Sequence, residues 1–121
     1  MIGPKYERKR RRDTKKAESV AAYDAAARRS GGLCEGCGLL EATQMHHRLY
    51  RSRSGLDEAQ NLFHCCVTCH GIAHSGREGE RLGWAIRSGG DPLKVEVTYR
   101  GKPGFLTADG KFQSKYPAVT R

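Results

Sequence analysis

The chain has 121 residues, which leaves room for one small domain with little apolar core to spare. Its 22 lysines and arginines outnumber 13 aspartates and glutamates, and the formal charge of +9 favours a polyanionic partner such as nucleic acid. The sequence contains no run of about 18 apolar residues and no signal-peptide pattern, so we expect a soluble, cytoplasmic protein that does not act at a membrane.

The first segment, residues 1–16, reads MIGPKYERKRRRDTKK. It is polar and strongly basic and has no apolar periodicity, which predicts a flexible arm. Such an arm can be a solvated tail that aids solubility or an arm that binds phosphates. The basic charge of the whole chain favours phosphate binding.

The next segment, residues 13–29, is rich in alanine and predicts a helix. Arg28 and Arg29 fall in its last turn, and Gly31 and Gly32 stop it. We expect this helix to be a structural brace, with one stripe facing the core: Ala17, Val20, Ala21 and Ala25.

Beyond residue 76 the pattern predicts a small helix-and-strand region. Residues 77–88 can form a short helix that places Leu82, Ala85 and Ile86 inward, and residues 93–100 alternate as in a half-buried strand. Turn residues then separate further short strands near Phe105 and Phe112. We therefore expect a single domain over residues 17–121, with its functional core in residues 33–75, where every cysteine and histidine lies.

Two cysteine pairs with the same spacing predict a structural zinc site. Cys34 and Cys37 form the first pair, and Cys66 and Cys69 the second. Four thiolates at this spacing are typical of tetrahedral zinc, whereas two pairs argue against buried free thiols and the lack of a βαβ pattern argues against a thioredoxin-like redox pair. Cys65 is adjacent to Cys66 and should face the other way on extended chain, although exchanged roles stay open.

The histidines predict a second, open metal position. His70 and His74 are four residues apart and share one face of a helix that begins near Cys69. His46 and His47 are neighbours on extended chain, so they point to opposite sides. One of them can be a third metal ligand, while the other can take a proton from water at physiological pH. His64 has no predicted role.

The spacing of these residues resembles the HNH, or ββα-metal, nucleases. A histidine pair, His46 and His47, is followed by Asn61, His70 and His74, and NLFHCCVTCH matches the form Asn-Leu-x-x-x-Cys-x-x-Cys-His. The interleaved cysteines are similar to the zinc-stapled branch common among phage HNH endonucleases. This resemblance implies an α+β fold: a small ββα-metal core held by a four-cysteine zinc site, with an N-terminal helix, a C-terminal helix and short β-strands.

The resemblance also implies a role for each residue of the motif. His47 would be the general base, Asn61 would fix the loop that carries it, and a catalytic divalent cation such as Mg²⁺ or Mn²⁺ would be held by His46, His70 and His74. The reaction would be hydrolysis of DNA phosphodiester bonds to a 5′-phosphate and a 3′-hydroxyl. Phosphates beside the cleaved bond could be contacted by Arg48, Arg51 and Arg53.

Phage genes of this family are often linked to genome packaging. The resemblance therefore implies DNA processing or packaging in the host cytoplasm, with terminase subunits as candidate partners, while homing and genome degradation stay open. We expect a monomer. The main alternative is a noncatalytic zinc-dependent nucleic-acid-binding module, for which the basic arm and the cysteines would suffice, and an RNA-binding or RNA-processing protein is a third.

Overall fold

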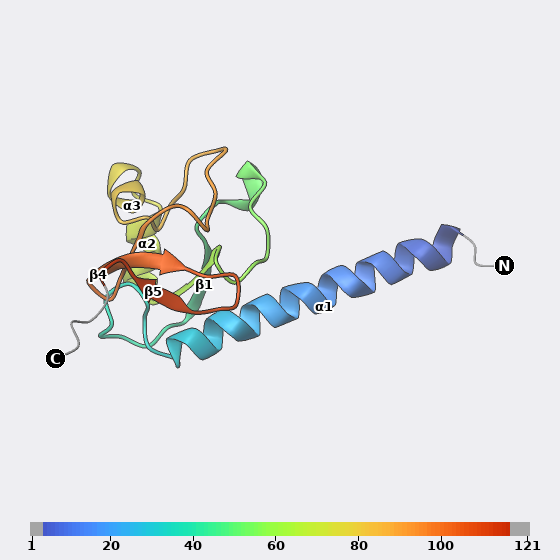
Figure 1. The fold of residues 1–121 in the computed structure, drawn as a ribbon, viewed down its shortest axis with the longest axis horizontal. Coiled ribbons are helices and arrows are strands. Elements are labelled where there is room, and N and C mark those ends of the chain that lie inside the picture. The colour runs from blue at the N-terminus through green and yellow to red at the C-terminus, as the bar shows by residue number, and fades with distance from the viewer. Residues whose placement is uncertain (1–3, 117–121) are drawn as a thin grey trace.

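The computed structural model describes residues 4–116 and shows a small body of mixed helices and strands, from which one long helix projects (Figure 1). The predicted α+β class is confirmed. Residues 1–3 of the predicted arm and residues 117–121 of the predicted domain lie outside the described part. The elements in chain order are α1 (Pro4–Ser30), β1 (Gln44–His47), the 3-10 helix η1 (Arg51–Arg53), β2 (Leu62–Cys65), α2 (Val67–Ala73), α3 (Arg77–Arg81), β3 (Val97–Tyr99), β4 (Lys102–Leu106) and β5 (Phe112–Ser114).

The strands form two antiparallel sheets. β1 pairs with β2, with His46 opposite Phe63 and His47 opposite Leu62, and α2 follows β2 directly. The other sheet has the order β3-β4-β5, which confirms the strands predicted near Phe105 and Phe112. Residues 48–61 connect the two strands of the first sheet, and the pairing of β1 with β2, followed at once by α2, brings His46 close to the segment that carries Cys66, Cys69 and His70.

Helix α1 begins earlier than predicted. It starts at Pro4 rather than near Asp13, so the segment expected to be a flexible arm is helical from residue 4 onward. Proline suits the first position of a helix, and the lysines, arginines and glutamate that follow are good helix formers. The helix ends at Ser30, and Gly31 follows with a φ of 63°. No described helix has an apolar stretch long enough to cross a bilayer.

The inward face of α1 is also not the predicted stripe. Val20 is 53 % exposed, whereas Ala22 and Ala26 are buried against Leu62 of β2. Alanines occur on several sides of this helix, so they do not define its buried face. Polar contacts from Ser19 and Arg29 define that face instead.

In the region after α2, the helix and the first strand are shorter than predicted, but Ala85 and Ile86 face inward as expected. Helix α3 ends at Arg81, because Gly83 takes a φ of 71° and lies against the backbone of Glu96, with no room for a side chain. Ala85 and Ile86 are buried as predicted, although they lie beyond the helix. The strand predicted over residues 93–100 is short: only β3 pairs, and Leu93 is exposed.

The apolar core is thin and includes the cysteines. Phe63 packs against Trp84, with ring centroids 5.5 Å apart, and Val97 and Leu106 close the cluster beside them. A core of this size leaves polar side chains to connect the segments that it does not reach.

A buried ion pair makes one such connection. Arg29 of α1 donates to both carboxylate oxygens of Glu35, at 2.6 and 2.8 Å, and to the carbonyl oxygens of Ala59 and Leu62. Glu35 also accepts a hydrogen bond from the backbone N–H of His64. This pair therefore joins α1, the loop that carries Cys34 and Cys37, and β2.

Replacing Arg29 by alanine should destabilise the fold strongly. It leaves the Glu35 carboxylate buried without its cation, which costs about 3 to 5 kcal/mol in comparable pairs. Denaturant unfolding of Arg29→Ala should show this loss, whereas the neighbouring Arg28→Ala, an exposed side chain on the same turn, should stay within about 0.5 kcal/mol of the original chain. Equal effects at the two positions would contradict the assigned role of the ion pair.

Candidate metal centres and the environment of His47

Four cysteine sulfurs converge where α2 begins. Cys34 and Cys37 come from the loop after α1, Cys66 caps the N-terminus of α2, and Cys69 lies in its first turn. Their Sγ atoms lie within 4.8 Å of one another. Four sulfurs at the usual zinc–sulfur distance of about 2.3 Å would be separated by about 3.8 Å, so this group fits a tetrahedral zinc ion.

Backbone N–H groups prepare these sulfurs to be thiolates. Cys34 Sγ accepts from the N–H groups of Gly36, Cys37 and Cys66 at 3.2–3.4 Å, and Cys66 Sγ accepts from Cys69. Burial opposes ionisation of Cys34, but these hydrogen bonds outweigh it and lower its pKa to about 6. Burial raises the pKa of Cys69, which a bound dication would reverse.

Cys65 and His64 lie outside this group. Cys65 ends β2, is fully buried in the apolar cluster, and has its pKa raised to about 12 by burial. His64 Nδ1 lies 2.7 Å from the hydroxyl of Ser30 at the end of α1. Both residues therefore have packing or positioning roles in the fold. The spacing of residues in the sequence did not predict this role for His64.

Three histidines form the second group. His46 comes from β1, and His70 and His74 come from successive turns at the C-terminal end of α2. One ring nitrogen of each lies within 4.8 Å of the others, and the two Nε2 atoms of His70 and His74 are 3.2 Å apart. Two imidazoles on one cation at about 2.1 Å place their nitrogens about 3 to 3.4 Å apart, so the spacing fits a shared ion.

Neighbouring groups orient these rings and favour the neutral form of His46 and His70. The carbonyl oxygen of Trp84 accepts from His46 Nε2 at 2.6 Å, so the lone pair of His46 is on Nδ1. Burial lowers the pKa of His46 to about 4, against the effect of this hydrogen bond. Burial and the nearby His74 lower the pKa of His70, and Tyr50 stacks on His74 at 5.0 Å. Neutral imidazole is the form that binds metal.

His47 faces away from this group, toward Asp57. Its Nε2 lies 2.7 Å from Asp57 Oδ1, and Ser19 of α1 donates to the other oxygen at 2.9 Å. The hydrogen bond with His47 is the main cause that lowers the pKa of Asp57, and Ser19 and Arg51 add to it. A carboxylate can only accept, so Nε2 carries the proton and Nδ1 of neutral His47 has a free lone pair.

Asp57, Ser19 and Trp84 were not identified from the sequence as site residues. Asp57 is one of several polar residues in RSRSGLDEAQ and is ten positions from His47. Ser19 and Trp84 reach the site from α1 and from the segment after α3. No spacing rule connects such distant segments. Asp57 could have been proposed as a partner of a histidine only because it lies between the histidine pair and Asn61 in the sequence.

The side chain of Asn61 bonds the loop that follows β1 at two points. Its side chain accepts from the N–H of Leu49 at 2.7 Å and donates to the carbonyl oxygens of Leu49 and Leu56 at 3.0 Å. The amide is 1 % exposed, so it is available for nothing else. Asn61 therefore holds the backbone of the segment between β1 and β2 at Leu49 and at Leu56.

The three arginines expected near phosphates are placed differently. The prediction that Arg48 contacts phosphate is wrong, because its side chain is fully buried. It donates to four carbonyl oxygens, those of Gly83, Gln60, Pro92 and Val95. Arg53 donates to Ile86 and lies over the Tyr50 ring. The side chain of Arg51 is 66 % exposed and reaches Asp57 at 3.4 Å, beside His47. Arg51 is therefore the best placed of the three to contact a ligand.

The two groups should be separable by zinc content. Cys37→Ser removes one of four thiolates, so the tightly held zinc should be lost after dialysis and the melting temperature should fall, because metal binding contributes directly to folding. Cys65→Ala and His70→Ala should both retain the zinc, as measured by elemental analysis. Loss of the tightly held zinc from His70→Ala would contradict the division into two sites.

The chain was compared with protein-family models, curated proteins and solved structures, and none of them matches it.

Proposed function

We propose that the protein is a metal-dependent endonuclease that hydrolyses phosphodiester bonds of DNA. One observation carries this proposal: three histidines surround a common point, while a fourth, next to one of them on β1, is turned to a carboxylate. The other ring nitrogen of this fourth histidine has no hydrogen bond to any described residue. A protein that only binds nucleic acid through zinc would need the cysteines but not this second arrangement.

The histidine group would hold the catalytic cation. His46, His70 and His74 are neutral donors, so a dication bound to them keeps its full charge, and three protein ligands leave coordination positions for other groups. When bound, the cation would polarise a phosphate oxygen and stabilise the oxygen that leaves. His74 is exposed, whereas the cysteine group is mostly buried, so the histidine group is the more accessible of the two.

The donor set also bears on which cation binds. Imidazole nitrogen suits zinc, nickel, cobalt and other transition ions, whereas Mg²⁺ prefers carboxylate, carbonyl and water oxygens. We therefore infer that Mn²⁺ or Co²⁺ binds this group more tightly than Mg²⁺. This refines the sequence-based expectation, which treated Mg²⁺ and Mn²⁺ as equal candidates.

His47 would be the general base. Its Nδ1 takes a proton from a water molecule whose oxygen attacks phosphorus, and the bond from phosphorus to the 3′ oxygen breaks as the new bond forms. Asp57 would be a positioning residue, because it holds the ring in the tautomer whose lone pair is on Nδ1. Arg51, exposed beside His47, would contact a phosphate oxygen.

Replacing His47 by alanine should abolish most of the cleavage. Supercoiled plasmid incubated with Mn²⁺, Co²⁺ or Mg²⁺ should be nicked by the original chain and protected by a chelator, and His47→Ala should be slower by about 100- to 10,000-fold, the usual contribution of a general base. Its zinc content and melting temperature should be unchanged. Undiminished cleavage by His47→Ala would refute the mechanism, and no cleavage by the original chain with any metal would favour the noncatalytic module.

Replacing Asp57 by asparagine should slow cleavage by at least about 10-fold, because an amide can present its N–H to His47 Nε2 and favour the wrong tautomer. Glu58→Gln is a matched control, since it removes one negative charge at the neighbouring, exposed position. The rates should be compared at saturating metal, beside melting curves of both variants. Equal rates in the two variants would show that Asp57 does not position His47.

A further inference from the structure

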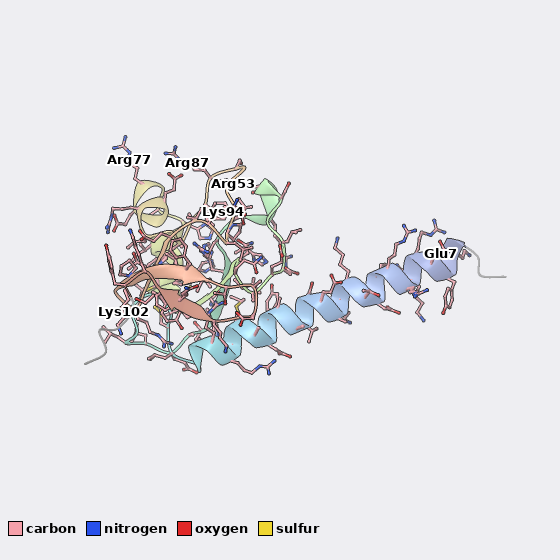
Figure 2. The ribbon with its side chains drawn as sticks, in the orientation of Figure 1. Glu7, Arg53, Arg77, Arg87, Lys94 and Lys102 are labelled. Carbon is pink, nitrogen blue, oxygen red and sulfur yellow. The ribbon has the colours of Figure 1, made fainter. Side chains whose placement is uncertain are left out.

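The N-terminal half of α1 lies outside the body of the protein. Figure 1 shows the helix continuing well past the sheets, and in Figure 2 Glu7 marks its far end, away from every other element. Each described side chain from residue 5 to residue 18 is exposed. Packing against the apolar core therefore does not stabilise this part of the helix.

Most cations of this segment lie on one side of the helix. With 3.6 residues per turn, positions seven and eleven residues before Ser19 and Tyr23 return to nearly the same side as those two residues. Positions on or next to that side form what we call the basic stripe: Lys5, Arg8, Lys9, Arg12, Lys15 and Lys16. The acidic residues Glu7, Asp13 and Glu18 fall outside it.

The basic stripe leads to the candidate active site. Ser19 donates to Asp57, and the Tyr23 ring lies 6.3 Å from that of His47, with its hydroxyl 3.3 Å from Arg51. Since a helix rises 1.5 Å per residue, Arg12 lies about 10 Å and Lys5 about 21 Å beyond Ser19. The stripe is thus an extension of the same side of α1 that supports His47.

In the part of the chain that the structure describes, the stripe has no acidic partners of its own. Within residues 5–116 no ion pair involves any of its six cations, and the one pair in this half of α1 joins Glu7 to Arg11 at 3.9 Å. Like charges four residues apart, such as Arg8 and Arg12, repel and weaken the helix. A polyanion along the stripe would relieve this repulsion.

The polyanion that fits is a nucleic acid rather than a membrane. A helix that lies on a membrane needs an apolar face opposite its charges, and here Tyr6 is the single large hydrophobic residue between residues 5 and 16. A duplex presents regularly spaced phosphates over the length that the stripe spans.

We propose that the basic stripe binds backbone phosphates of duplex DNA about three to six base pairs from the cleaved bond, at 3.4 Å per base pair. The position relative to the cut rests on the proposed endonuclease function, whereas binding itself does not. Helix α1 then holds the part of the duplex that lies on one side of His47. The helical content of its exposed half increases when the duplex is bound.

The test compares two triple variants of the full-length, zinc-loaded chain. Lys5→Gln/Arg8→Gln/Arg12→Gln removes three charges from the stripe, and Arg28→Gln/Lys102→Gln/Lys111→Gln removes three exposed charges elsewhere. Lys102 lies across the body from the stripe (Figure 2). Glutamine keeps a helix propensity close to that of lysine and arginine. Binding to a labelled duplex is measured without added catalytic metal, between about 50 and 200 mM salt.

The stripe variant should lose about two to three units from the slope of log affinity against log salt, since each phosphate contact contributes about 0.9, and its affinity at ~0.1 M salt should fall at least about tenfold. The control variant should lose less than one unit. Duplex should raise the helicity of the original chain by circular dichroism but not that of the stripe variant. On short duplexes the original chain should avoid cutting within about six base pairs of one end of each strand, and the stripe variant should not.

Equal losses in the two triple variants would overturn the proposal, as would binding to anionic phospholipid vesicles as tight as binding to duplex and equally dependent on the stripe. Stripe-dependent binding without cleavage under any metal would support it while refuting the endonuclease. Cleavage that depends on His47 but not on the stripe, with unchanged salt dependence, would refute it and leave the endonuclease intact.

Discussion

The first turn of α2 is the constraint on which both candidate metal centres depend. Cys66 caps this helix and Cys69 lies in its first turn, and both face the sulfurs of Cys34 and Cys37. His70 follows directly, and one residue along a helix turns the side chain by about 100°, so it faces away from the sulfurs and toward His46. A zinc ion on the cysteines would thus fix the start of the helix that presents His70 and His74. In a chain with so thin an apolar core, the structural group would determine how accurately the histidine group is placed.

The other half of the site is fixed from β1 and the loop after it. Strand alternation puts His46 and His47 on opposite sides, and the loop is then held by two buried polar residues. Asn61 bonds backbone at two points, and Arg48 donates to four carbonyl oxygens from three segments. Hydrogen bonds of this kind contribute little each to net stability, but losing one partner leaves buried groups unpaired, so they restrict the loop to one arrangement. The pairing of His47 with Asp57 requires that restriction.

The features that could be predicted from the sequence are those whose causes lie within a few residues. The pairing of Cys66 with Cys69 and of His70 with His74, and the opposite facing of His46 and His47, depend on spacings of one to four residues, which fixed helix and strand periods convert directly into geometry. The joining of the two cysteine pairs could be predicted because a structural zinc ion takes four ligands. The buried face of α1 could not be predicted, because its alanines lie on several sides and its orientation is set by Arg29 reaching Glu35 and Leu62. Arg48 looked like a phosphate contact because its acceptors, Gly83 to Val95, are distant in the chain. The start of α1 at Pro4 was missed because a helix without an apolar face gives no periodic signal.

Helix α1 connects these parts through one continuous backbone. Its C-terminal half is fixed to the body by Ala22 and Ala26 on Leu62 and by the buried pair of Arg29 and Glu35, and between these contacts and the exposed half lies Ser19, bonded to Asp57. No proline or glycine lies between Lys5 and Ser30, and a helix without them bends little over two turns. A displacement of the exposed half by a ligand would therefore be transmitted along the helix to Ser19 before it reached the packed half. Through Ser19 and Asp57, contacts made by the exposed half of α1 would therefore bear on the orientation of the His47 ring.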